Sequence, residues 1–85
     1  MNKEILELYS WVIRGKQRSL VIKALNGIKT PTQIKEETKL GLNNVSDILR
    51  LFVKKGIAKC LNENEKVGRL YKLTQKGEGI LKNLN

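Results

Sequence analysis

The chain has 85 residues, 40% of them hydrophobic, and carries 17 Lys+Arg against 8 Asp+Glu, a net charge of +9. This length predicts one domain, residues 1–85, with a single small core. The sequence has no histidine, the commonest general base and metal ligand, and its one cysteine, Cys60, cannot form an internal disulfide or a thiolate metal cage. We therefore expect no enzymatic activity, cofactor or metal, and we expect the positive charge to attract a polyanion.

The sequence also gives an expectation about location. Its longest apolar runs, such as residues 20–22, are far shorter than the ~20 residues of a membrane span. Glu4 and Glu7 stand where a secretory signal would have its apolar stretch. Together with the single cysteine, these features favour a cytoplasmic protein without a membrane partner.

Two helices are predicted in the first third of the chain. Apolar residues recur at helical spacing over residues 3–14, and a second helix over residues 16–25 buries Val21, Ile22 and Leu25. Asn26-Gly27 closes the second helix, because a glycine commonly adopts a left-handed conformation where a helix ends. Tyr9 and Trp11 on the first helix suit either the core or a contact between two copies of the chain.

The third helix has a strong start signal. Thr30-Pro31-Thr32-Gln33 combines a threonine cap, proline at the first helical position and glutamine three residues after the cap, which predicts a capping box and a helix over residues 31–38. A tight turn at residues 39–41 leads into a fourth helix over residues 43–55, which Gly56 ends.

After Gly56 the pattern becomes that of strands. Residues 57–61 alternate with Ile57 and Leu61 inward, and residues 69–73 alternate with Tyr71 and Leu73 inward, which predicts an antiparallel hairpin. Thr74 is expected to cap a last helix over residues 75–84, which packs either on the domain body or on a partner. This order of elements is that of a winged helix-turn-helix, an α+β fold that is mostly helical.

The fourth helix has two contrasting faces. One stripe is apolar, and the other is polar and becomes basic toward its end, as suits a helix that reads base edges with its first residues and reaches the backbone with its later ones. The alternative is an ordinary solvated helix face. Asp47 is open to three interpretations: it pairs with Arg50, it accepts a bond from cytosine, or this face does not touch DNA. The candidate DNA-binding residues of this helix are Asn43, Asn44, Ser46, Asp47, Arg50 and Lys54.

Further DNA contacts are predicted outside the fourth helix. Lys66 and Arg69 in the hairpin loop suit a wing that contacts backbone or minor groove, although a turn that merely joins two strands explains the loop tip as well. The candidate phosphate contacts are Lys16, Arg18, Thr32 and Gln33. For Arg18 the alternative is a salt bridge to Glu36 or Glu37.

The sequence resembles the small archaeal winged helix-turn-helix transcriptional regulators and, more distantly, the arsenical-resistance and multiple-antibiotic-resistance repressors. The resemblance is carried by GKQR at 15–18, TPTQI at 30–34, LNNVSDIL at 42–49, KGI at 55–57 and RLYKLTQKG at 69–77. It implies a homodimer that binds double-stranded DNA in a sequence-specific way, with Asn43, Asn44, Ser46 and Arg50 at recognition-helix positions and Lys66 and Arg69 in the wing.

The sequence departs from the family pattern in two places. Lys35 stands where the family commonly has an alanine that packs on the recognition helix, so either this contact is looser or the lysine points outward. The cysteine and histidine clusters of the family's metal sensors are missing. The rival hypothesis is a winged helix that serves as a protein-interaction module or complex subunit without sequence-specific DNA binding.

Overall fold

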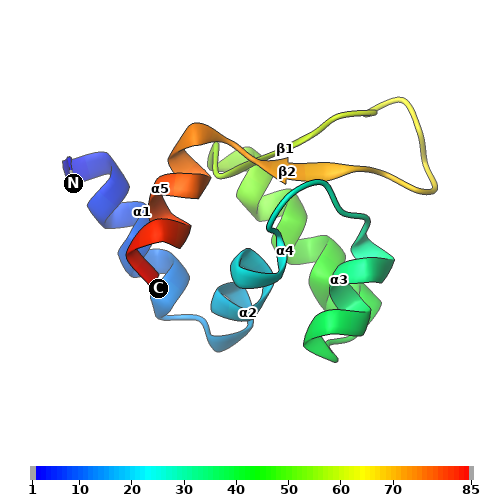
Figure 1. Ribbon diagram of the computed structural model, residues 1–85, viewed down its shortest axis with the longest axis horizontal. Helices are drawn as coiled ribbons and strands as arrows, with labels where there is room; N and C mark the ends of the chain where they lie inside the picture. The colour runs from blue at the N-terminus through cyan, green and yellow to red at the C-terminus, as the bar shows by residue number, and fades with distance from the viewer. Residues whose placement is uncertain (1, 85) are drawn as a thin grey trace.

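The computed structural model describes residues 2–84, which form five helices and one two-stranded hairpin. Their order is α1 (Lys3–Ile13), α2 (Lys16–Ala24), α3 (Pro31–Thr38), α4 (Leu42–Lys54), β1 (Ala58–Cys60), β2 (Tyr71–Leu73) and α5 (Gln75–Leu84). The predicted order of elements is therefore confirmed, and the helix boundaries agree to within one residue. Figure 1 shows α1 and α5 at one end of the molecule and the long hairpin loop at the other.

The core lies where the helices and the hairpin meet. Helix α4 contributes a stripe that repeats at helical spacing, Val45, Ile48, Leu49 and Phe52, each at most 8% exposed. This stripe fixes the rotation of α4, so the opposite polar face is left in solvent. The other buried hydrophobic residues are Val12, Val21, Ile22, Leu25, Ile34, Ile57, Ala58, Tyr71, Leu73 and Ile80.

The hairpin differs from the prediction in its inward face. Ala58 pairs with Leu73 and Cys60 with Tyr71, so these residues share the inner face. The prediction that Leu61 points inward is wrong, because Leu61 pairs through its N–H with the Leu70 carbonyl beyond β1 and is 43% exposed. Ile57 is fully buried, but it precedes the strand. Both strands are also shorter than the five residues predicted for each.

An unpredicted backbone bridge ties the hairpin to the chain before α3. The N–H of Lys29 donates to the Tyr71 carbonyl at 3.0 Å, and the N–H of Tyr71 donates to the Lys29 carbonyl at 2.9 Å. Thr30, the next residue, caps α3. The bridge therefore fixes the start of α3 beside β2.

Helices α1 and α5 both pack on the rest of the domain within one copy of the chain. The Trp11 ring meets the Phe52 ring edge-on, with 5.9 Å between centroids, and Tyr9 packs partly against the core. Ile80 of α5 is fully buried, so the last helix packs on the domain body. No helix among residues 2–84 has the length and apolarity that crossing a membrane requires.

Helix α5 supplies a stability test in its two glycines. A Cβ on Gly77 would lie 2.0 Å from the Ile57 carbonyl oxygen, whereas a Cβ on Gly79 would have nothing within 4 Å. We predict that Gly77→Ala lowers the free energy of unfolding by about 2–3 kcal/mol, because backbone must move. Gly79→Ala should raise it by about 0.5–1 kcal/mol, because alanine is the better helix former. Urea unfolding followed by circular dichroism measures both, and similar effects of the two substitutions would contradict this packing.

Candidate nucleic-acid interface

A groove of about 350 Å³ opens between the start of α3, the exposed face of α4 and the hairpin loop. We call the loop, residues 61–70, the wing, and the hollow the α3–α4–wing groove. Its lining comes from residues 30–32 at the start of α3, from Leu42, Ser46 and Arg50 of α4, from residues 66–69 of the wing, and from Tyr71 of β2. Three cations, Arg50, Lys66 and Arg69, and no carboxylate are among these residues.

The exposed face of α4 presents the DNA-binding residues predicted on this helix. Asn43, Asn44 and Lys54 are exposed, and Ser46 is half-buried at the groove, where Arg50 also lies. Leu42, which the sequence reasoning left out, is 43% exposed and belongs to the same lining. Leu42 lies four residues before Ser46, and residues at this spacing are neighbours on one face of a helix. The sequence would have predicted this position if the helix had been started one residue earlier, at residue 42.

Asp47 pairs with Arg50, which confirms one of the three interpretations of this carboxylate. The Arg50 guanidinium donates to the Asp47 carboxylate at 2.5 Å, and both side chains are about two-thirds exposed. A pair this exposed contributes little to stability. Its consequence is orientation, because one nitrogen of the guanidinium is held while the remaining donors stay available to a ligand.

The wing is held by hydrogen bonds that the sequence reasoning missed. The Asn62 side chain accepts from the Leu70 N–H at 2.7 Å and donates to the Gly68 carbonyl at 3.2 Å. The Arg69 guanidinium donates to the Glu65 carbonyl at 2.7 Å and, more weakly, to the Glu63 carbonyl at 3.5 Å. Arg69 therefore shapes the wing as well as lining the groove, while Lys66 is exposed.

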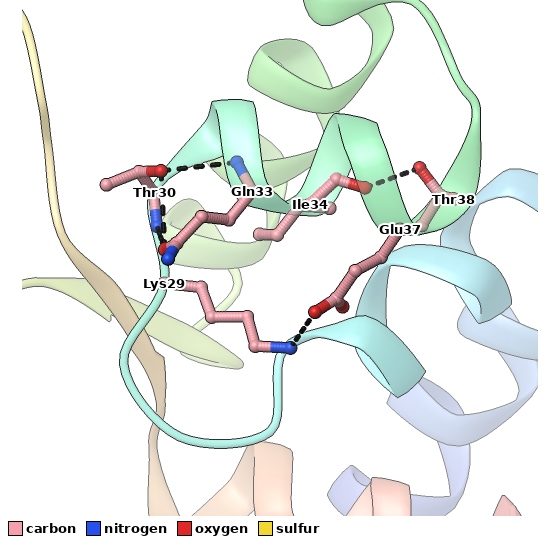
Figure 2. A network of polar contacts seen from close by, with 6 residues as sticks. All are labelled: Lys29, Thr30, Gln33, Ile34, Glu37 and Thr38. Atoms are coloured by element: carbon pink, nitrogen blue, oxygen red, sulfur yellow. Dashed lines mark hydrogen bonds and ion pairs between the residues drawn. The ribbon is translucent and has the colours of Figure 1, made fainter.

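The capping box of α3 forms as predicted. The Thr30 hydroxyl accepts from the Gln33 N–H at 3.2 Å, and the Gln33 side chain accepts from the Thr30 N–H at 2.8 Å (Figure 2). Gln33 thus serves the helix start and is not among the groove-lining residues, whereas Thr32 is. The Lys29 ammonium, just before α3, forms an ion pair with the carboxylate of Glu37 on α3, at 2.5 Å (Figure 2). Lys35 is exposed and points away from the core.

Besides Gln33, two more of the four predicted phosphate contacts, Lys16 and Arg18, lie outside the groove lining. The Arg18 guanidinium donates to the Trp11 carbonyl at 2.6 Å and stacks on the Trp11 ring, 4.3 Å from its centroid. Lys55 lies over the same ring at 4.7 Å. The predicted alternative, a salt bridge from Arg18 to Glu36 or Glu37, is wrong, because Trp11 takes the guanidinium and Lys29 takes Glu37. Lys16 is exposed at the first position of α2.

No protein-family model and no curated protein sequence matches the chain. Among solved structures it is similar to TubR of Bacillus thuringiensis serovar israelensis, in complex with 24 bp of tubC, at 16% identity and TM-score 0.78, over 99% of this chain and 92% of TubR. It is also similar to the reduced form of MarR from Escherichia coli, at 26% identity and TM-score 0.74, over 95% of this chain and 62% of MarR.

A MarR family transcriptional regulator from Silicibacter pomeroyi matches at 20% identity and TM-score 0.66, over 93% of this chain. The chain spans 55% of that protein and 62% of MarR, and so corresponds to part of each. These likenesses establish the winged helix-turn-helix fold that the order of elements predicts, with α3 and α4 as the helix-turn-helix and residues 61–70 as the wing.

The hydrogen bonds of Asn62 predict how the wing responds to substitution. Asn62→Ala leaves the Leu70 N–H without its acceptor, so amide exchange at Leu70 should accelerate about tenfold or more. Asn64→Ala is the matched control, because Asn64 is exposed in the same loop and makes no hydrogen bond among the described residues. Exchange measured by NMR distinguishes the two, and equal Leu70 rates in both variants would show that Asn62 does not hold the wing.

Proposed function

We propose that the chain is a sequence-specific double-stranded DNA-binding transcriptional regulator. One observation carries this proposal: the start of α3, the polar face of α4 and the wing share one groove whose lining holds three cations and no carboxylate. A net charge of +9 adds a field that draws a polyanion toward this surface. The likeness to TubR, a protein seen in complex with DNA, and to MarR supports the same function.

Helix α4 is the element we assign to the major groove. The groove is about 12 Å wide and accepts an α-helix, whose first residues reach the base edges. Asn43 and Asn44 have the amides that bond adenine, and Arg50 has the fork that bonds guanine at O6 and N7. Asp47 holds that fork by one nitrogen at 2.5 Å, so Arg50 needs less ordering when it binds. Lys54, one turn beyond Arg50, is placed to reach the phosphate backbone.

The wing and the start of α3 take the sequence-independent contacts in this proposal. Lys66 is exposed on the wing and has no ion pair among residues 2–84, so it can neutralise a phosphate. Arg69 contributes charge while its guanidinium holds the loop. The active form is proposed to be a homodimer that binds two half-sites about 34 Å apart. The chain is proposed to act by binding alone, without catalysis.

Arg50 and Lys66 should differ in how their loss affects DNA binding. On a duplex obtained by random-site selection with the full chain, Arg50→Ala should cost about 1–3 kcal/mol and relax the preference at one base pair. Lys66→Ala should weaken selected and random duplexes alike and reduce the slope of log K against log salt by about one. Lys3→Ala on α1 is the control, since it removes the same charge far from the groove. Fluorescence anisotropy over a salt series measures all four proteins.

Two results would contradict the proposal. Equal losses from Arg50→Ala on selected and random duplexes would contradict base reading by α4. Weak binding of the unsubstituted chain to every duplex, with little dependence on salt, would favour a protein-interaction module instead, and the 87% exposed Val67 on the wing would then be a contact candidate.

A further inference from the structure

Tyr71 has an unusual combination of burial and bonding. The residue is only 5% exposed, its ring belongs to the core, and its backbone is fixed on both sides by Cys60 and Lys29. The Tyr71 hydroxyl makes no hydrogen bond among the described residues. Among the same residues, no side-chain nitrogen or oxygen is both buried and without a hydrogen-bond partner. The hydroxyl is therefore not fully covered by protein, and Tyr71 belongs to the lining of the α3–α4–wing groove.

A second unpaired donor belongs to the same lining. At the start of α3, Pro31 has no N–H, the Gln33 N–H is taken by the Thr30 hydroxyl, and the Ile34 N–H donates to the Thr30 carbonyl. The Thr32 N–H has no partner among the described residues, and Thr32 lines the groove together with Tyr71. With Arg50, Lys66 and Arg69 around them, these neutral donors favour an anion with several acceptor oxygens.

The position of the groove identifies that anion. The groove lies between α4, which we assign to the major groove, and the wing, which suits the phosphate backbone or the adjacent minor groove. Between two neighbouring grooves runs the sugar–phosphate backbone of a single strand. A side chain whose donor opens between the two elements therefore faces phosphate oxygens and not base edges.

We propose that the Tyr71 hydroxyl donates a hydrogen bond to a backbone phosphate of one DNA strand seated in the α3–α4–wing groove, beside the Thr32 N–H. This inference rests on the proposed function. The core holds the ring, so the donor is positioned before binding and loses little entropy. Because the hydroxyl is neutral, its contact with a phosphate releases no counterion. Its contribution to affinity therefore does not depend on salt, whereas that of Lys66 does.

The test is Tyr71→Phe, which keeps the buried ring and removes only the hydroxyl. Binding should weaken about 10- to 100-fold, as expected for a hydrogen bond to a charged group, and equally on selected and random duplexes, with the salt slope unchanged. The chain has one other tyrosine, Tyr9 on α1, outside the groove lining. Tyr9→Phe is the matched control and should bind as the unsubstituted chain does. Thermal unfolding checks that both variants are folded.

A second measurement locates the contact on the DNA. Each phosphate of the selected duplex is replaced in turn by an uncharged methylphosphonate, and Tyr71→Phe is compared with the unsubstituted chain on every duplex. At one phosphate position per bound chain, Tyr71→Phe should cause no further loss of affinity, because the methylphosphonate there has already changed the partner of the hydroxyl.

Three outcomes would overturn the proposal. The first is unchanged affinity of Tyr71→Phe, or a further loss at every methylphosphonate position. The second is a loss confined to the selected duplex, which would mean that Tyr71 contacts a base. In both of these the unsubstituted chain still binds DNA, so the proposed function stands. The third is failure of the unsubstituted chain to bind any duplex, which removes the proposed function and this contact together.

Discussion

The backbone bridge between Lys29 and Tyr71 is the constraint on which the α3–α4–wing groove depends. Strands β1 and β2 have three residues each, and a two-stranded hairpin of that length is marginal in water by itself. The two hydrogen bonds between Lys29 and Tyr71 give β2 a second neighbour, and the residue after Lys29, Thr30, begins the capping box of α3. One bridge thus sets the wing, the start of α3 and the Tyr71 hydroxyl around a common groove.

The elements and their order could be predicted from the sequence because each has a local signal. The capping box at Thr30, the glycines at 27 and 56 and the helical period of Val45, Ile48, Leu49 and Phe52 are properties of neighbouring residues. The bridge from Lys29 and the phase of β1 could not be predicted in this way. Both depend on which residue pairs across the sheet, and a five-residue strand pattern fits either phase when the true strand has three residues.

In the candidate site, too, interactions between neighbouring residues could be predicted from the sequence and interactions between distant residues could not. Where a partner stands one helical turn away, as Asp47 does from Arg50, the spacing offered the pair as one of three interpretations. Where the partner comes from another element or from loop backbone, spacing gave no guide: Arg18 lies on Trp11, and Arg69 bonds carbonyls of its own loop. Both arginines were predicted as DNA contacts from their charge and from their places near a helix start and in the wing. In the structure, each of these two arginines makes its interactions within the chain.

Amide chemical-shift mapping with a duplex tests most directly whether the α3–α4–wing groove is the surface that DNA covers. The isotope-labelled chain is titrated with the duplex obtained by random-site selection, at low and moderate salt. The largest shift changes should fall on residues 30–33, residues 42–50 and residues 66–71, with α1 and α5 changing only where two copies of the chain meet. Changes centred on α1 or α5 without changes at the groove, or no changes at saturating duplex, would contradict this assignment.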